Sequence, residues 1–314
     1  MNLKGNSGCN IERQDGVVVK SAVGSYVPRL REQAYKQMAS ANLFGTTYNL
    51  IVGTSVLNIV EDTAPNGEPR IQVTMPYIKG STVAQELLSG NKGISAAKDL
   101  SSFIGKNFAF NNILNSYDIF KNKCDDMIKK TPELKEELEW FLQTFQSDLQ
   151  TLRAGYCHGD LTLENVIAGK WKASEDEPKA TRALYLIDFL DSFIDTPFVD
   201  AATVLQDCLC HWSYRYDALE DYQIEYLNKF TVDFLENFYN EGLVKQNFLK
   251  TIFIFLLFKI YRIVPYAKDN VTKEWCDKNI KYIKNTIDII NGMEFPNVWK
   301  FIKEMDLLPK RVRI

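Results

Sequence analysis

The sequence predicts an α+β protein with two lobes: a small β-rich amino-terminal lobe containing one helix, and a larger, mostly helical carboxy-terminal lobe. Two observations predict this division. Short segments rich in β-branched residues and bounded by turn residues dominate the chain up to Gly80. Beyond that point apolar residues recur mostly at helical spacing. We therefore place one lobe at residues 1–79 and the other at residues 80–314.

The amino-terminal lobe is built from short predicted elements. Val17–Lys20 predicts a strand, and Pro28–Ser40 predicts a helix whose proline lies in the first turn. Leu50–Val60 and Arg70–Tyr77 predict two further strands. Ala64–Gly67, which contains a proline, an asparagine and a glycine, predicts the turn between them.

The carboxy-terminal lobe is expected to be mainly helical. Pro132–Arg153 predicts one long helix, with Thr131 as its N-cap and the proline at its first position. Asn165–Ala168 and Ala183–Phe189 predict two short strands, and helices are expected from Phe198 onward.

Composition excludes several classes of protein. With 46% hydrophobic and 25% charged residues, the chain of 314 residues is typical of a globular protein. A net charge of −3 gives no general attraction to nucleic acid or to anionic membranes, so we expect neither partner. The apolar run Ile252–Phe258 is much shorter than the ~20 residues of a membrane span.

Cysteine usage and the start of the chain suggest a cytoplasmic protein. The six cysteines are scattered and form no CxxC pair, which favours reduced thiols over disulfides or a zinc site. Met1–Gly5 lacks the apolar stretch of a signal peptide. The sequence gives no indication of the oligomeric state.

The residues that carry chemistry lie in two segments. In Tyr156–Asn165, an aspartate (Asp160) is followed five residues later by an asparagine (Asn165). In a phosphoryl-transfer loop such an aspartate orients the acceptor hydroxyl or takes its proton, and such an asparagine binds magnesium. Further on, the apolar strand Leu184–Ile187 ends in Asp188, whose carboxylate is placed to bind a metal that bridges nucleotide phosphates. Each segment alone would be an ordinary turn or strand end, but their combination in this order favours phosphoryl transfer.

These segments resemble the aminoglycoside phosphotransferase and choline kinase-like family, the small-molecule branch of the protein kinase-like fold. The resemblance runs through His158–Asn165, Ile187–Asp191 and Pro197–Asp200. The family commonly has an Asp-Pro-x-x-Asp block at the last of these, whereas here Thr196 precedes the proline. Elsewhere the similarity is one of element order.

The resemblance implies a protein kinase-like fold and a set of roles. It implies Asp160 as the catalytic aspartate, with Asn165 and Asp188 as ligands of Mg²⁺. It also implies that Asp200 braces the catalytic loop, although an aspartate at a helix N-terminus is an equally good interpretation. We expect His158 to belong to the scaffold of that loop.

The amino-terminal lobe would then bind ATP. Lys20 would contact the α- and β-phosphates, and Glu32 on the following helix would pair with it. Gly5, Ser7 and Gly8 lie where a turn would cover the phosphates with its backbone N–H groups. A lysine at a strand end is usually solvated. The prediction for Lys20 is therefore supported only by the helix and the carboxylate that follow it.

The segment Gln72–Gly80 resembles the hinge that holds adenine. Met75 would border the pocket, Pro76 would offer its carbonyl, and Ile78 would offer its N–H. A strand that ends in a proline-containing turn is the alternative interpretation.

The acceptor is expected to bind after Asp200. An aromatic set there would cage a quaternary ammonium or simply form a packed helix face. Lys259 and Arg262, on an otherwise apolar helix, would favour an anionic or hydroxyl-rich acceptor or else extend to solvent. The sequence does not choose between a sugar, an amino alcohol and a hydroxy acid. The candidates after Asp200 are Asp207, His211, Trp212, Tyr214, Arg215 and Tyr216.

The sequence thus predicts an ATP- and Mg²⁺-dependent kinase that acts on a hydroxyl of a small molecule. A protein kinase is one alternative, but only eleven residues separate Asp188 from Asp200, and no Ala-Pro-Glu motif follows. A nucleotide-binding module without catalysis is the other, and the intact set of Lys20, Asp160, Asn165 and Asp188 argues against it.

Overall fold

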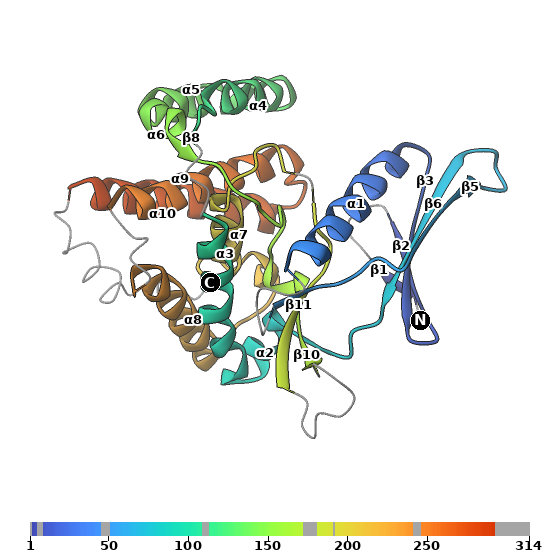
Figure 1. Cartoon of the computed structure of the whole chain (residues 1–314). Coiled ribbons are helices and arrows are strands. Elements are labelled where there is room, and N and C mark those ends of the chain that lie inside the picture. Colours follow the sequence, from blue (N-terminus) through green and yellow to red (C-terminus); the bar gives the residue numbers. More distant parts are fainter. Residues whose placement is uncertain are drawn as a thin grey trace. The chain divides into compact units, whose positions relative to one another are not determined.

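The computed structural model describes residues 2–4, 9–44, 51–108, 113–171, 181–190, 192–240 and 246–292 (Figure 1). These residues form two compact units. The first unit combines Met1–Val83 with Glu164–Asp191, and the second combines Ala84–Leu163 with Ser192–Ile314. The expected α+β, bilobal organisation is confirmed. The first stretch of the first unit ends at Val83, close to the predicted boundary at Lys79, and the unit also contains a segment from the middle of the chain.

A five-stranded antiparallel sheet forms one layer of the first unit, in the order β1-β2-β3-β6-β5. Asp15 and Gly16 join β2 to β3, and both have positive φ, 33° and 82°. A two-residue Asp-Gly link is preferred in hairpin turns that require positive φ at both positions. This turn fixes the register of β3, the central strand of the sheet. The strands are β1 (Asn2–Lys4), β2 (Asn10–Gln14), β3 (Val17–Val23), β5 (Asn58–Thr63) and β6 (Pro69–Pro76).

Helix α1 (Val27–Phe44) packs on this sheet, as Figure 1 shows beside β3 and β6. The core between them contains Leu30 and Ala34 of the helix and Ile71 and Val73 of β6. Burial of these apolar side chains drives the packing of the helix against the sheet.

A second sheet of the first unit has the order β4-β11-β10-β7. β10 and β11 form an antiparallel hairpin, and β4 pairs with β11 in parallel. At Gly80 a side chain would collide with the carbonyl oxygen of Ala168, so the close pairing of β7 with β10 requires glycine. The strands are β4 (Ile51–Gly53), β7 (Gly80–Thr82), β10 (Val166–Trp171) and β11 (Thr181–Leu186).

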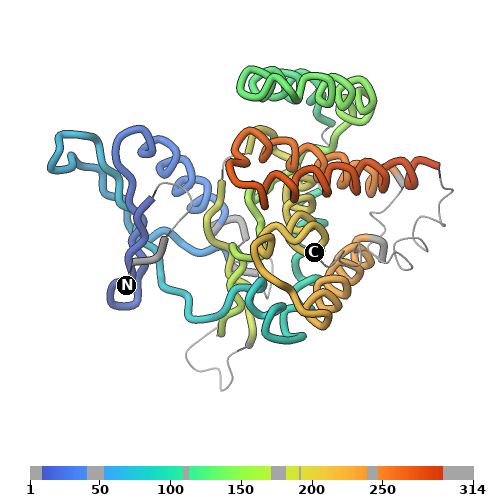
Figure 2. The backbone as a smooth tube through the Cα atoms, turned by 180° about the vertical axis from the view of Figure 1, so that it is seen from behind, coloured from blue at the N-terminus to red at the C-terminus, as the bar shows by residue number. Residues whose placement is uncertain are grey.

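The second unit is mostly helical. The middle of helix α9, Ile252–Phe258, is apolar and buried on all sides. The helix packs against α7 and α10, and Figures 1 and 2 show α9 and α10 running side by side. Rings of Phe198 on α7 and Phe255 on α9 stack with centroids 5.7 Å apart. The α-helices here are α2 (Val83–Ser89), α3 (Ala96–Asn107), α4 (Tyr117–Lys130), α5 (Lys135–Thr144), α6 (Gln146–Gln150), α7 (Phe198–Cys208), α8 (Asp221–Asn240), α9 (Gln246–Ile263) and α10 (Asn270–Gly292).

Smaller elements complete the described part of the chain. Short 3₁₀ helices are η1 (Gly24–Tyr26), η2 (Asn91–Ser95), η3 (Pro132–Leu134), η4 (Leu163–Asn165), η5 (Trp212–Tyr214) and η6 (Val264–Tyr266). The strands β8 (Ile113–Leu114) and β9 (Leu152–Arg153) pair with each other. In the part of the chain that the structure describes, no helix is both long and apolar enough to span a lipid bilayer.

The prediction of one helix over Pro132–Arg153 is wrong in its continuity. The segment forms η3, α5 and α6 and ends in β9, and Phe145 between α5 and α6 has a non-helical φ of −109° and ψ of 15°. Phe141, Phe145 and Leu149 are all buried, so the apolar period continues through the break. The pattern therefore predicts the buried face correctly, whereas tertiary packing decides where the backbone bends.

The prediction of one strand over Leu50–Val60 is also wrong in its continuity. The structure has β4 and β5 there, separated by residues 54–57 and belonging to different sheets. Leu50 lies outside the described residues.

Candidate functional site

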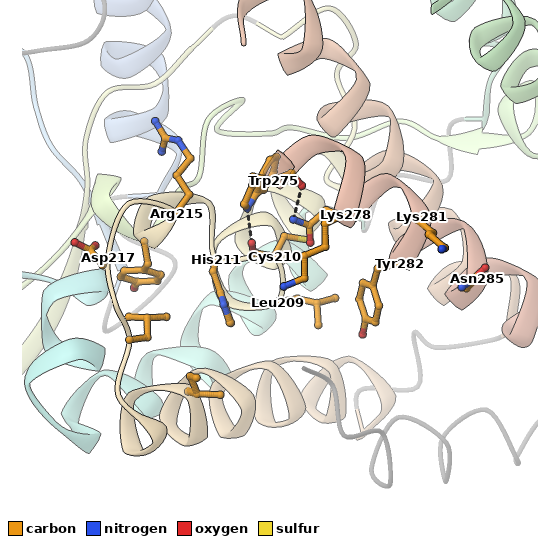
Figure 3. Close-up of a pocket in the computed structure, with 14 residues that line it drawn as sticks. Leu209, Cys210, His211, Arg215, Asp217, Trp275, Lys278, Lys281, Tyr282 and Asn285 are labelled. Atoms are coloured by element: carbon orange, nitrogen blue, oxygen red, sulfur yellow. Dashed lines mark hydrogen bonds between the residues drawn. The ribbon is translucent and has the colours of Figure 1, made fainter. Parts of the chain in front are cut away.

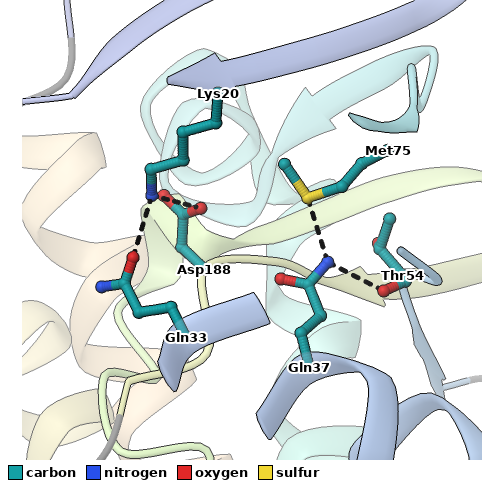
Figure 4. A network of polar contacts seen from close by, with 6 residues as sticks. All are labelled: Lys20, Gln33, Gln37, Thr54, Met75 and Asp188. Atoms are coloured by element: carbon teal, nitrogen blue, oxygen red, sulfur yellow. Dashed lines mark hydrogen bonds and ion pairs between the residues drawn. The ribbon is translucent and has the colours of Figure 1, made fainter. Parts of the chain in front are cut away.

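Lys20 is buried in the first unit and forms a salt bridge with the carboxylate of Asp188. Its ammonium lies 3.1 Å from Oδ1 of Asp188 and 3.4 Å from Oε1 of Gln33 (Figure 4). Lys20 lies on the central strand β3 and is only 4% exposed. A buried ammonium is costly unless it is paired and hydrogen-bonded, and the two partners meet that need.

The helix partner of Lys20 is Gln33, whereas the sequence predicted Glu32. The buried residues of α1 include Leu30, Gln33, Ala34 and Gln37, which recur three or four positions apart. Glu32 falls outside this period and is exposed. Since residues three and four apart share one face of a helix, Gln33 faces the sheet and Glu32 does not.

Gln37 lies one turn beyond Gln33 on the same face. Its Nε2 donates to the carbonyl of Thr54 at 2.8 Å and lies 3.1 Å from Sδ of Met75 (Figure 4). Sequence reasoning missed Gln33 and Gln37. The available signal was a pair of polar residues, four apart, on the apolar face of a predicted helix.

The structure brings Asn165 and Asp188 to the same end of the β10–β11 hairpin. Val166 pairs with Leu186, and the N–H of Ile187 donates to the carbonyl of Asn165 at 3.1 Å. Asp188 follows directly with a left-handed φ of 59°. Aspartate tolerates this conformation better than most residues, and such backbone strain is concentrated at functional sites.

The donor atoms at this hairpin end fit a hard divalent cation. The Asp188 side chain is 34% exposed, and its Oδ2 has no hydrogen-bond partner among the described residues. A carboxylate and an amide oxygen are ligands that magnesium prefers. The described residues contain no group of three or more His, Cys, Asp or Glu side chains suited to a metal ion. Asn165 and Asp188 are therefore our candidate ligands.

The predicted hinge residues Met75 and Pro76 end β6, and Ile78 lies two residues beyond it. Met75 is buried, and Val17 pairs with Pro76, the last residue of the strand. Ile78 lies close to Gly169 of β10, where an added Cβ would be 3.3 Å from Cγ2 of Ile78. The backbone N–H of Ile78 has no hydrogen-bond partner among the described residues. The predicted phosphate-covering residues Gly5, Ser7 and Gly8 lie outside the described residues.

In the second unit, Asp200 braces the loop that carries Asp160. Its carboxylate oxygens accept hydrogen bonds from the backbone N–H groups of His158, at 2.6 Å, and Gly159, at 2.9 Å. Gly159 has a positive φ of 90°. The N–H of Asp160 donates to Nδ1 of His158 at 3.3 Å, and His158 is fully buried. The expected scaffold roles of Asp200 and His158 are confirmed by these contacts.

Asp207 holds the other end of the same loop. Its Oδ2 accepts from the N–H of Leu163 at 2.6 Å, and its Oδ1 accepts from the backbone and hydroxyl of Ser213. Burial raises the pKa of Asp207 to about 7, and the nearby charge of Asp160 adds to the effect. Asp207, suggested as an acceptor contact by the sequence, is therefore part of the scaffold. Asp200 and Asp207 lie seven residues apart, two turns of α7, so one helix face holds both ends of the loop.

A cavity of about 390 Å³ opens behind this scaffold in the second unit. Figure 3 shows the side chains of His211, Lys278 and Tyr282 facing it from the loop after α7 and from α10. The indole N–H of Trp275 donates to the carbonyl of Cys210 at 2.6 Å and fixes one wall.

The aromatic residues after α7 already pack against a cation of the protein itself. The guanidinium of Arg215 lies 3.8 Å from the ring centroid of Trp212 and 4.4 Å from that of Tyr216. A cation of the protein itself thus sits where a quaternary ammonium would be caged, which favours the packed interpretation of these rings.

Comparison with known proteins reveals similarity in structure but not in sequence. No protein-family model matches the sequence, and no curated protein matches it. The amicoumacin kinase hAmiN, solved with AMP-PNP, Ca²⁺ and Ami, matches with a TM-score of 0.57 and 14% identity over 95% of this chain and 91% of that one. A thermostable mutant of the aminoglycoside phosphotransferase APH(4)-Ia in its apo form matches with a TM-score of 0.58 and 11% identity, covering 93% of this chain and 95% of that one.

The chain has the fold of these phosphotransferases. The expected kinase-like fold is thereby confirmed over nearly the whole chain. The structural match establishes the fold, whereas sequence identity this low says nothing about the activity, which depends on the site.

Proposed function

We propose that the protein is a kinase that transfers the γ-phosphoryl group of ATP to a hydroxyl group of a small molecule. The observation that carries this proposal is the buried Lys20–Asp188 pair of 3.1 Å with Asn165 at the same hairpin end. These groups match the phosphate and metal contacts that phosphoryl transfer requires. The fold shared with two phosphotransferases supports the same conclusion.

In the proposed reaction the acceptor oxygen attacks the γ-phosphorus of ATP. A new P–O bond forms as the bond between that phosphorus and the β,γ-bridging oxygen breaks, and ADP leaves. Asp160 orients the acceptor hydroxyl and accepts its proton, while Lys20 contacts the α- and β-phosphates. Asn165 and Asp188 would hold Mg²⁺, which would neutralise charge on the phosphates. The AMP-PNP and Ca²⁺ in hAmiN support the use of a nucleotide and a divalent cation.

The remaining nucleotide contacts belong to the first unit. We propose that Pro76 and Ile78 pair with adenine through their backbone groups beside Met75. Gly5, Ser7 and Gly8 are proposed to cover the phosphates. For the helix partner of the lysine we replace Glu32 by Gln33, whose Oε1 lies 3.4 Å from the Lys20 ammonium.

We also propose that the protein works in the cytoplasm, on a small molecule rather than on nucleic acid or a membrane. All six cysteines are buried and none forms a disulfide, which suits a reducing compartment. The net charge of −3 supports the absence of an affinity for polyanions.

The test is a screen of the purified protein with ATP and Mg²⁺ over sugars, amino alcohols and hydroxy acids. ADP release is followed, and the phosphorylated acceptor is identified by mass spectrometry. We expect ADP and a phosphate monoester in equal amounts with at least one acceptor. A thermal shift with ATP and Mg²⁺ but no product from any acceptor would instead favour a nucleotide-binding module. Phosphate transfer to protein alone would favour a protein kinase.

A further inference from the structure

Two cationic side chains interrupt the buried helix α9. Every residue of its apolar run Ile252–Phe258 is buried, and Lys259 and Arg262 follow, both partly buried. They are three residues apart and so lie on one face of the helix. Within the described part of the chain, neither side chain makes a hydrogen bond or an ion pair.

The two cations share a helix face with Phe255, whose ring stacks on Phe198 of α7, two residues before the Asp200 that braces the Asp160 loop. Asp160 interacts electrostatically with both Lys259 and Arg262. Asp200 and Cys157 also lie within electrostatic range of Lys259, and Tyr266 lies within range of Arg262.

Phe193 and Asp200, two other neighbours of these cations, form no ion pair with Lys259 or Arg262. The guanidinium of Arg262 lies 5.0 Å from the ring centroid of Phe193. The oxygens of Asp200 already accept the N–H groups of His158 and Gly159. Asp160 is therefore the carboxylate that faces both cations while keeping a catalytic role of its own.

Among the residues that the structure describes, no carboxylate forms an ion pair with either cation. Burial lowers the pKa of Lys259 to about 8, and repulsion from Arg262 acts in the same direction. One carboxylate, Asp160, cannot neutralise two cations. Partly desolvated charges gain most from a ligand of opposite charge, and an arginine fork matches the two oxygens of a carboxylate or phosphate.

We propose that Lys259 and Arg262 form an anion subsite beside Asp160, so that the acceptor carries a carboxylate or phosphate group close to the hydroxyl that is phosphorylated. The inference rests on the proposed kinase function and narrows its acceptor class. It favours hydroxy acids and phosphorylated polyols over amino alcohols, since a cationic acceptor would be repelled.

The first experiment compares matched acceptors that differ only in the anionic group. The probes are D-glycerate, glycerol 3-phosphate and glycerol, with gluconate and sorbitol as a second set. We expect kcat/KM to be at least tenfold higher for an anionic member than for its neutral partner. The two kinds of anion distinguish a carboxylate from a phosphate site. Equal or better turnover of the neutral partners would overturn the subsite and leave the kinase function intact.

The second experiment removes the charges. Lys259→Met and Arg262→Met should each raise KM for the anionic acceptor about tenfold while leaving KM for ATP unchanged, and Arg262→Lys should retain most of the affinity. Lys273→Met, which removes an exposed charge from the neighbouring helix α10, is the control and should match the wild type. A rise in KM for ATP with no change for the acceptor would assign the cations to the nucleotide phosphates and contradict the proposal.

A binding measurement keeps the inference testable without turnover. Calorimetric titration of the full chain with glycerate and with glycerol 3-phosphate should show binding of at least one, lost in Lys259→Met. If no acceptor releases ADP but this charge-dependent binding is found, the kinase function fails and the anion subsite stands. If ADP is released but neither anion binds, the subsite fails.

Discussion

At the scale of single residues, the structure differs from the expectation in the helix residue that contacts Lys20. A neutral amide, Gln33, takes the position where a carboxylate was expected, so Asp188 supplies the negative charge that balances the buried ammonium. The lysine is therefore held directly against the carboxylate that we propose as a metal ligand.

The Lys20 contact predicts unequal effects at two neighbouring positions. Gln33→Met should destabilise the protein by about 1–3 kcal/mol, because it leaves a buried donor short of one acceptor. It should also raise KM for ATP, because Lys20 loses one of its two fixed contacts. Urea unfolding and steady-state kinetics would measure the two effects. Glu32→Gln on the exposed face is the matched control, and an effect of Glu32→Gln larger than that of Gln33→Met would contradict the structure.

The buried carboxyl of Asp207 predicts a pH dependence of stability. Its pKa is raised from the ordinary 3.8 to about 7 by burial. Between pH 4 and 7 the unfolded chain has therefore lost this proton while the folded chain retains it, so the free energy of unfolding should fall as pH rises through that window. Asp207→Asn should flatten the dependence. Urea titrations of both proteins at pH 5, 6 and 7 would measure it, and equal slopes would contradict the assignment.

At the scale of elements, helix α7 supports the loop that carries Asp160. Asp200 in its first turn and Asp207 at its end accept backbone N–H groups from both ends of that loop. One rigid helix thereby sets the position of Asp160, which otherwise lies on irregular backbone.

This support predicts how loss of the brace affects catalysis. Asp200→Asn replaces an acceptor oxygen with an amide donor facing an N–H group, so it should cost about 1–3 kcal/mol of stability. It should also lower kcat at least tenfold with little change in KM for ATP, because Asp160 is displaced while the nucleotide contacts stay. An unchanged kcat in the folded variant would show that the brace only stabilises the fold.

The extent to which each element could be predicted from sequence depends on the range of the interactions that form it. The apolar period of α1 and the β-branched segments of β3 and β6 are local, and they predicted those elements well, whereas β1 and β2 were not predicted. The assignment of Glu32 failed because a shift of one residue on a helix changes the face, and only packing against the sheet fixes that register. The break at Phe145 likewise depends on contacts made elsewhere in the fold.

At the scale of the whole molecule, candidate functional motifs could be proposed from the sequence because short segments carry them. Asp160, Asn165 and Asp188 were proposed as site residues from their types and order. The sequence did not reveal that the segment from Glu164 to Asp191 joins the amino-terminal unit, because that grouping arises from pairing of β10 and β11 with β4 and β7. The left-handed backbone conformation of Asp188 could not be predicted either, because it depends on how the hairpin ends.

The central claim is that this chain uses the Asp188 carboxylate to transfer phosphate from ATP. Asp188→Asn tests it most directly, because asparagine also tolerates the left-handed conformation with φ of 59° and preserves the shape of the side chain. With ATP, Mg²⁺ and an acceptor identified in the screen, we expect the variant to fold but to be less stable than the wild type, because the buried Lys20 ammonium loses its counter-charge. We expect it to form the phosphorylated product on the order of 10²-fold more slowly or not at all. Product formation at the wild-type rate by the folded variant would contradict the account.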